Sequence, residues 1–309
     1  IRRFPFIRPH WIASGNQMYP NQEPGEHPWN RAAGHNHLNR NKLGITLDLN
    51  HPRGVQLFKD LVAISDIVTE NFRTGVMERF GLDYPDLVKI NPSIIMVSLP
   101  GFGRTGPYAT YASMGTSNDG ASGNTALRGY IGDDPSKTMG VVHPDGVASL
   151  NGAVAALMAY YYRLRTGKGQ HVDLAQTEVT MTQLADAIMD YTMNRRVQKP
   201  LGNRHPTYAP HGCYPCQGVD QWVVIAITTE EEWTTLVDLM GSPEWARDPR
   251  FADLFSRRNN QDEMDRRIGE WTSRYEKHQA MELMQKAGIS AGATMTMKDI
   301  YSDPHINSR

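Results

Sequence analysis

The chain has 309 residues, with 32 Lys or Arg against 33 Asp or Glu, so its formal net charge is −1. That length predicts about two domains of ~150 residues each. Hydrophobic residues make up 39% of the chain and charged residues 21%, which argues against wholesale disorder. The near-neutral balance argues against a nucleic-acid partner, because dedicated nucleic-acid binders usually carry a basic excess.

Two cysteines are too few for a disulfide framework or a Cys-only zinc site, which favours a cytoplasmic protein with no bound metal. No apolar run reaches the ~20 residues that a membrane span needs, and the longest candidate contains Arg163 and Arg165. The chain begins with Ile1 and Arg2, which fit neither an initiator Met nor a signal peptide. We therefore expect a piece of a longer polypeptide.

In chain order, residues 1–40 are rich in Pro, Asn, His and Trp and predict a long irregular segment. Residues 44–49 predict a short strand, and residues 52–65 carry apolar side chains at helical spacing. Residues 67–69 and 94–99 predict two more strands, the latter apolar throughout, as is typical of a strand buried on both faces. Strands that alternate with helices predict an α/β layer with a parallel sheet.

Residues 100–144 are rich in glycine and predict irregular structure. They precede a long helix over residues 145–165, a strand over 171–174 and a helix over 176–195. Residues 199–219 predict a loop, because Pro and Gly punctuate them.

A strand is expected over residues 222–227, and the pattern from residue 230 onward is mostly helical. We therefore expect an α/β domain with a mostly parallel sheet over residues 1–198 and a smaller α-rich α+β domain over residues 199–309.

Three short motifs invite assignments that their context does not favour. Residues 101–106 match the dinucleotide fingerprint G-x-G-x-x-G, but no amphipathic helix follows them, so a tight turn is the better interpretation. Cys213 and Cys216 have the spacing of a redox pair but lead into a strand, which favours two loop thiols. Residues 166–170 resemble a phosphate loop yet close a helix, which favours a helix C-cap.

Asp145 is the strongest catalytic candidate. It follows His143 and Pro144 and precedes a long apolar helix. An aspartate there caps the helix, and the positive end of the helix keeps its carboxylate ionised. An exposed, ionised carboxylate is also a potential nucleophile, so local pattern alone leaves capping and catalysis open.

Several motifs occur in a fixed order along residues 39–309. They are residues 39–49 (NRNKLGITLDL), 70–75 (ENFRTG), 79–82 (RFGL), 91–95 (NPSII), 101–107 (GFGRTGP), 122–123 (SG), Asp145, 166–170 (TGKGQ), 202–206 (GNRHP) and 248–251 (DPRF). Together they resemble the class III coenzyme A transferases, the family of formyl-CoA and crotonobetainyl-CoA transferases that also contains α-methylacyl-CoA racemase.

The resemblance implies a Rossmann-like large domain, a smaller domain and a homodimer of interlocked rings. It places the catalytic aspartate on Asp145. It places coenzyme A contacts around Leu47, on Asn71 and Phe72, and on Arg79, with Arg73 as a plausible phosphate partner. It also implies that a strand and helix normally precede the matched region and that a C-terminal segment normally follows it. Acyl-CoA and a small carboxylic acid are the implied substrates, with no permanently bound cofactor.

A glycine-rich loop that closes over substrate in some members falls near residues 203–208, where this chain has Asn203, Arg204, His205 and Pro206 instead. Arg204, with His205 beside it, is a candidate partner for the acceptor carboxylate, because a guanidinium fork matches that group. The alternative is a surface Arg that steadies the loop. Glycines of residues 101–106 or 120–123 are candidate backbone donors to an oxyanion.

The implied reaction moves coenzyme A from a thioester to a free acid through an aspartyl anhydride and an aspartyl-CoA thioester. A 2-methylacyl-CoA racemase is the alternative, but moving an α-proton needs a second acid–base group. The racemase His of this family lies shortly before the Ser-Gly motif, where this chain has Met114 and Gly115, and His143 is the nearest substitute. Transfer is therefore favoured, and an inactive or binding-only fragment is the third hypothesis.

Overall fold

A computed structural model describes residues 19–134, 136 and 143–309. The chain divides into two compact units, one within residues 1–118 and 142–180 and the other within 119–141 and 181–309. The division places residues 119–141 and 181–198 with the C-terminal part of the chain. The sequence-based limits of 1–198 and 199–309 therefore stay a prediction.

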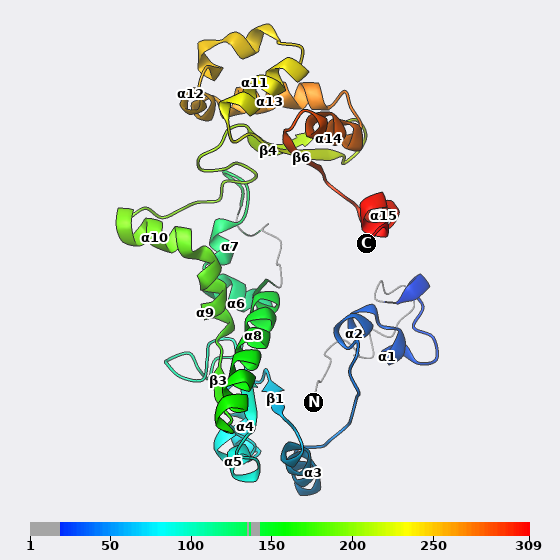
Figure 1. Cartoon of the computed structure of the whole chain (residues 1–309), viewed down its shortest axis with the longest axis vertical. Coiled ribbons are helices and arrows are strands. Elements are labelled where there is room, and N and C mark those ends of the chain that lie inside the picture. Colours follow the sequence, from blue (N-terminus) through cyan, green and yellow to red (C-terminus); the bar gives the residue numbers. More distant parts are fainter. Residues whose placement is uncertain (1–18, 135, 137–142) are drawn as a thin grey trace. The chain divides into compact units, whose positions relative to one another are not determined.

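The first unit contains a three-stranded parallel sheet of order β1-β2-β3, together with helices that are labelled in Figure 1. Its elements are η2 (Pro20–Gln22), α1 (Pro28–Arg31), α2 (Ala33–Leu38), α3 (Pro52–Ala63), β1 (Ile67–Glu70), α4 (Val76–Arg79), α5 (Tyr84–Ile90), β2 (Ile95–Ser98), α6 (Gly115–Ala121), whose last residues belong to the second unit, α8 (His143–Thr166), β3 (His171–Asp173) and α9 (Gln176–Met181).

The apolar run of β2 explains why this strand is central. All four of its residues are buried, with β1 and β3 on either side, and α8 packs against β2 and β3. Leu82, Leu87, Ile94 and Met96 belong to the core that α3 and α5 share with the sheet. The predicted parallel α/β layer is confirmed.

Three expectations for the first unit were wrong. Residues 44–49 form no strand, because no strand of the described residues pairs with them and only Leu47 and Leu49 turn toward the core. Residues 19–40, within the predicted irregular segment, contain the short helices α1 and α2, while residues 1–18 lie outside the described residues. The glycine-rich stretch 100–144 contains α6 and, in the second unit, α7; its residues 135 and 137–142 are not described.

The second unit is built on an antiparallel sheet of order β4-β5-β6. Helices α13 and α14 pack on this sheet and close a core that includes Trp233, Leu236, Ile268 and Met284. Its elements are α7 (Asn124–Leu127), η4 (Thr182–Leu184), α10 (Ala185–Asn194), β4 (His211–Pro215), β5 (Trp222–Ala226), α11 (Glu230–Leu239), η5 (Glu244–Arg247), η6 (Pro249–Phe251), α12 (Leu254–Asn259), α13 (Gln261–Thr272), α14 (Lys277–Lys286), β6 (Ser290–Ala293), α15 (Met297–Ser302) and α16 (Pro304–Asn307).

The predicted strand at residues 222–227 and the helices after residue 230 are confirmed. The predicted loop 199–219 is wrong in part, because β4 pairs along the whole of β5. Strand β6 was missed, and the predicted helix 176–195 is divided into α9, η4 and α10. In the part of the chain that the structure describes, no helix has the length and apolarity needed to cross a bilayer.

Candidate functional site

The carboxyl ends of the parallel strands carry a chain of polar side chains. Glu70 ends β1, and its buried carboxylate accepts the Phe72 backbone N–H at 2.7 Å and hydrogen-bonds the Ser98 hydroxyl at the end of β2. Ser98 Oγ lies 2.9 Å from Nε2 of His171 on β3. This row of hydrogen-bonded side chains crosses all three strands and fixes the turn that begins at Asn71.

Burial is the main cause of the pKa shifts of Glu70 and His171. Desolvation raises the pKa of Glu70, although hydrogen bonds from Ser98 and from the Phe72 backbone oppose that shift. Desolvation also lowers the pKa of His171, and the charge of Arg104 lowers it further. Both groups are therefore shifted toward their neutral forms.

Residues 101–106 form a tight turn that Arg104 anchors. Its backbone N–H reaches the Asp173 carboxylate at the end of β3, and its guanidinium pairs with Glu78 at 2.7 Å and with Asp83 at 2.8 Å. Gly101 is required, because a Cβ there would lie 1.9 Å from Ser113 Oγ. The motif thus ties the sheet to α4 and α5, and α4 begins beyond the turn that carries Asn71 and Arg73.

Gln176, at the start of α9, is the hydrogen-bonding centre of this edge. Its amide nitrogen donates to Asn71 Oδ1 at 3.2 Å and to the Leu99 carbonyl at 3.0 Å, and its amide oxygen accepts from Asn118 at 2.8 Å. Gln176 and Asn118 are both buried. The buried amide of Gln176 therefore fixes the orientation of the Asn71 side chain.

The predicted coenzyme A residues lie on neighbouring turns of this unit. Asn71, Phe72 and Arg73 directly follow β1; Asn71 and Arg73 are exposed, while Phe72 packs on the core. Leu47 is half-buried against the same core.

Arg79 ends α4 with its guanidinium 4.9 Å from the Phe80 ring centroid. An open pocket of about 300 Å³ lies beside it, lined by Leu49, Asn50, Pro52, Val55, Arg79 and Phe80.

Asp145 is exposed in the first turn of α8. The helix begins at His143, two residues earlier than expected, so Asp145 lies inside the helix instead of before it. Its backbone carbonyl accepts the Ser149 hydroxyl at 2.6 Å. Asp145 therefore lies near the positive end of the dipole of a 24-residue helix.

Arg204 and His205 lie in the second unit. Arg204 reaches Asp262 at 2.6 Å and Asp265 at 2.8 Å, and Tyr214 donates to the other oxygen of Asp265 at 2.9 Å. His205 Nδ1 accepts the backbone N–H groups of Thr207 and Tyr208. Desolvation, followed by the charges of His211 and Arg258, lowers the pKa of His205.

The remaining motifs have structural roles in the described residues. Gly167 ends α8 at a φ of 74°, with its N–H on the Arg163 carbonyl at 2.7 Å, so residues 166–170 do form the predicted C-cap. Cys213 lies on β4 and not in a loop, and burial raises the pKa of the Cys216 thiol to about 11. Both cysteines are free thiols, and neither is activated as a nucleophile.

Polar residues at the strand ends were missed by sequence reasoning. Glu70 and Ser98 were included only as parts of longer patterns, and Gln176 as the start of a helix. One signal was available, since Glu70, Ser98 and Asp173 each lie within one residue of the end of a predicted strand, and such ends meet at one edge of a parallel sheet. Within the described part of the chain, no three His, Cys, Asp or Glu side chains are grouped as a metal ion would need.

Comparison with known proteins decides the family. The family described as CoA-transferase family III matches residues 16–309, nearly the whole chain. This chain belongs to CoA-transferase family III. Members of this family are enzymes. The resemblance inferred from the ordered motifs is confirmed.

Named relatives agree with the family. The chain is 38% identical over 272 residues to succinyl-CoA–D-citramalate CoA-transferase of Chloroflexus aurantiacus, which covers 88% of this chain and 67% of that protein. It is 33% identical over 275 residues to acetyl-CoA:oxalate CoA-transferase of Acetobacter aceti, covering 88% and 69%. A CAIB/BAIF family protein from Brucella suis has a similar structure, with a TM-score of 0.82 and 34% identity over 90% of this chain and 73% of that one.

Proposed function

We propose that this CoA-transferase moves coenzyme A from an acyl-CoA thioester to a small free carboxylic acid, with Asp145 as the nucleophile. The observation that carries the proposal is an exposed carboxylate in the first turn of a 24-residue helix, in a chain of this family. The helix dipole favours the ionised carboxylate that a nucleophile requires. The relatives named for succinyl-CoA and oxalate support an acyl-CoA donor and a small acid acceptor.

Coenzyme A is proposed to bind along the turns that follow β1. The pocket beside Arg79 joins apolar walls to a guanidinium, a combination that suits an adenine ring next to a phosphate. Arg73 is exposed on the preceding turn and is the second proposed phosphate partner. Asn71 and Phe72 directly precede Arg73, and Gln176 and Glu70 hold them in place.

The reaction proceeds in four exchanges. The Asp145 carboxylate attacks the acyl carbonyl, the C–S bond breaks, and the thiolate leaves behind a mixed anhydride. The thiolate then attacks the aspartyl carbonyl, which releases the first acid and forms an aspartyl-CoA thioester. The acceptor carboxylate attacks that thioester to form a second anhydride, and the returning thiolate takes the new acyl group. Asp145 is regenerated, and the thioester energy is conserved without ATP.

Substitution of Asp145 tests the mechanism. Asp145→Asn keeps the size of the side chain but removes the nucleophile, so transfer from succinyl-CoA to an acid panel should fall at least roughly 1,000-fold. Asp186→Asn is the matched control, because Asp186 occupies the first turn of another helix, α10. Hydroxylamine added during turnover should mark Asp145 in the unaltered protein. Retention of full activity by Asp145→Asn would disprove the nucleophile.

The racemase alternative is disfavoured, because this chain has no histidine at the position where the resemblance places the second acid–base group. Met114, at the position expected for the histidine, is exposed, and its backbone exchanges hydrogen bonds with Ser117. His143 is exposed in the same helical turn as Asp145. Exchange of deuterium at the α-carbon of a 2-methylacyl-CoA, measured without any acceptor acid, separates the two reactions: transfer predicts none.

A homodimer is the second part of the proposal. The outward face of α8 exposes large apolar side chains, and Met189 and Met193 on α10 are also exposed. A helix that is apolar on all sides is normally covered. We propose that a second copy of this chain covers the face of α8.

A further inference from the structure

We propose that the small pocket between residues 201–206 and α12 binds the free carboxylic acid, and that Arg258, not Arg204, holds its carboxylate. The inference rests on the proposed function, whose acceptor it places. The pocket measures about 280 Å³ and lies wholly within the second unit. Its lining residues are Ile131, Leu201, Arg204, His205, Pro206, Phe255, Arg258, Asn259 and Gln261.

Arg204 is already occupied. Its guanidinium contacts carboxylate oxygens of Asp262 and Asp265 at 2.6–3.1 Å. A new carboxylate would have to displace one of these partners and leave it unpaired beside the incoming charge. The ion pairs instead fasten the loop to α13, so Arg204 positions the pocket wall.

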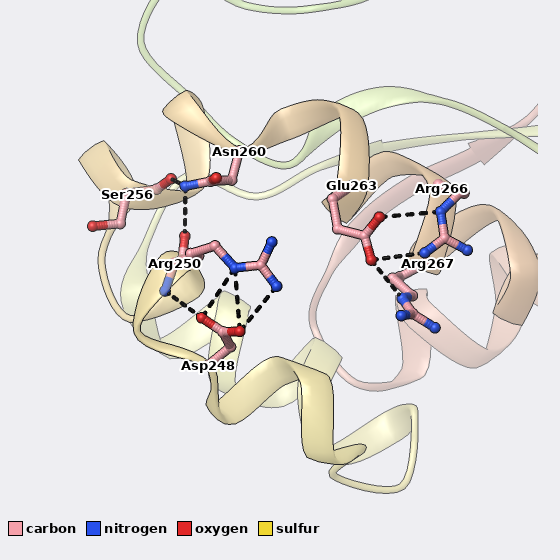
Figure 2. Close-up of polar contacts among 7 residues, drawn as sticks. All are labelled: Asp248, Arg250, Ser256, Asn260, Glu263, Arg266 and Arg267. Atoms are coloured by element: carbon pink, nitrogen blue, oxygen red, sulfur yellow. Dashed lines mark hydrogen bonds and ion pairs between the residues drawn. The ribbon is translucent and has the colours of Figure 1, made fainter.

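Arg258 differs from the other arginines of its neighbourhood. Residues 250–267 contain five arginines, of which Arg250, Arg257, Arg266 and Arg267 each pair with a carboxylate. Figure 2 shows Arg250 with Asp248, and Arg266 and Arg267 with Glu263. No carboxylate of the described residues lies within 4.0 Å of the Arg258 guanidinium in the ion-pair geometry. Its planar fork therefore retains the capacity to bind an acid.

Neutral groups complete the pocket. Two backbone N–H groups donate to His205 Nδ1, so the neutral ring carries its proton on Nε2, as a hydrogen-bond donor. His205 and Arg258 both line the pocket, and the charge of Arg258 contributes to the lowered pKa of His205.

Asn259 and Gln261 add amide donors, while Phe255, 72% exposed, and Leu201 supply apolar walls. A volume near the lower end of the range for ligand sites suits a small aliphatic acid better than a bulky one.

The test separates acid binding from catalysis. Calorimetry of the full chain with succinate, glutarate and oxalate as probes measures binding without acyl-CoA. Arg258→Gln should weaken binding of the best probe about tenfold or more, because a charge-assisted bidentate contact is lost. Arg258→Lys keeps the positive charge but not the bidentate fork. Its affinity for the probe should lie between that of the unaltered protein and that of Arg258→Gln. Arg250→Gln, which removes an arginine already paired with Asp248, should bind as the unaltered protein does.

Kinetics provide the second readout. In Arg258→Gln the KM for the acid should rise about tenfold while the KM for acyl-CoA stays unchanged. The inference is wrong if none of the three acids binds, if Arg258→Gln binds them normally, or if Arg250→Gln weakens binding equally. A protein that transfers no CoA would refute the proposed function, while calorimetry would still decide the pocket.

Discussion

At the residue scale, His171 is where protonation is most directly linked to the fold. Its imidazole stacks on Tyr84 at 5.2 Å and hydrogen-bonds Ser98, in surroundings that lower its pKa mainly by desolvation. The unfolded chain, whose histidines have a pKa of about 6.5, therefore binds the proton more readily than the folded chain does. The stability that His171 contributes is present above that pH and is lost as the pH falls through the lower, folded-state value.

His171→Gln should remove this pH dependence. The glutamine amide keeps a donor for Ser98 but does not titrate, so the free energy of unfolding of the variant should gain on that of the unaltered protein as the pH falls from 7.5 to 5. Urea unfolding at several pH values measures the difference. Glu70, whose raised pKa acts with the opposite sign, is present in both proteins and largely cancels. His37→Gln, which replaces an exposed histidine, is the control. The assignment would be contradicted if the unfolding free energy of His171→Gln changed with pH in parallel with that of the unaltered protein.

At the scale of elements, the turn between α8 and β3 shows two glycines with different reasons for being glycine. Gly167 has a φ of 74° and nothing within 4 Å of an added Cβ. Gly169 donates to the Pro92 carbonyl at 3.1 Å, and its Cβ would lie 1.9 Å from the Ile94 carbonyl oxygen. The first glycine is required by the backbone angle, and the second by the close approach of the chain that enters β2.

Alanine at each position should separate these causes. Gly167→Ala should cost about 1 kcal/mol of unfolding free energy for the left-handed conformation. Gly169→Ala should cost about 2–3 kcal/mol, because backbone on both sides has to move. Chemical denaturation at one pH measures both values. Equal losses, or a smaller loss for Gly169→Ala, would contradict the close approach.

Elements with a strong apolar pattern were predictable, and elements that depend on a partner were not. β2 and α8 carry long apolar runs and were placed within two residues. β6 has the sequence Ser-Ala-Gly-Ala, which contains no branched or aromatic side chain and becomes a strand only because β5 pairs with it. Residues 44–49 are the converse, a strand-like pattern to which no neighbouring strand pairs in the described residues.

The candidate site divides in the same way. Asp145 and the residues after β1 followed from ordered motifs, and where they bind substrate remains a proposal. The supports of the site could not be read from the sequence, because Glu70, Ser98 and Gln176 acquire a role only when the sheet brings segments 28 and 77 residues apart within hydrogen-bonding distance. Likewise, the acidic partners of Arg204 lie 58 and 61 residues away, which no local pattern reveals.

At the scale of the whole molecule, α8 has two apolar faces with different sizes of side chain. Small residues face the sheet: Ala148, Gly152 and Ala159 are buried, and a Cβ on Gly152 would lie 2.8 Å from Leu99. The opposite face exposes large side chains, namely Leu150, Val154, Leu157, Met158, Tyr161 and Leu164, each 56–73% accessible. Such a continuous apolar stripe is unusual on a monomer, and it is the surface that we propose a second copy of this chain covers.

A charge in the middle of this stripe should disrupt the proposed dimer. Leu157 is 67% exposed, so Leu157→Glu leaves the fold of a single chain intact but places a carboxylate in the apolar interface. Light scattering should give twice the monomer mass for the unaltered protein and the monomer mass for the variant. Val219→Glu is the control, since Val219 is 91% exposed on a turn of the other unit and should leave the dimer unchanged. Because the proposed interface belongs to α8, whose first turn carries Asp145, loss of the dimer should also lower CoA transfer. An unaltered protein that stays monomeric at every concentration, or a dimer that persists in Leu157→Glu, would disprove this face as the dimer interface.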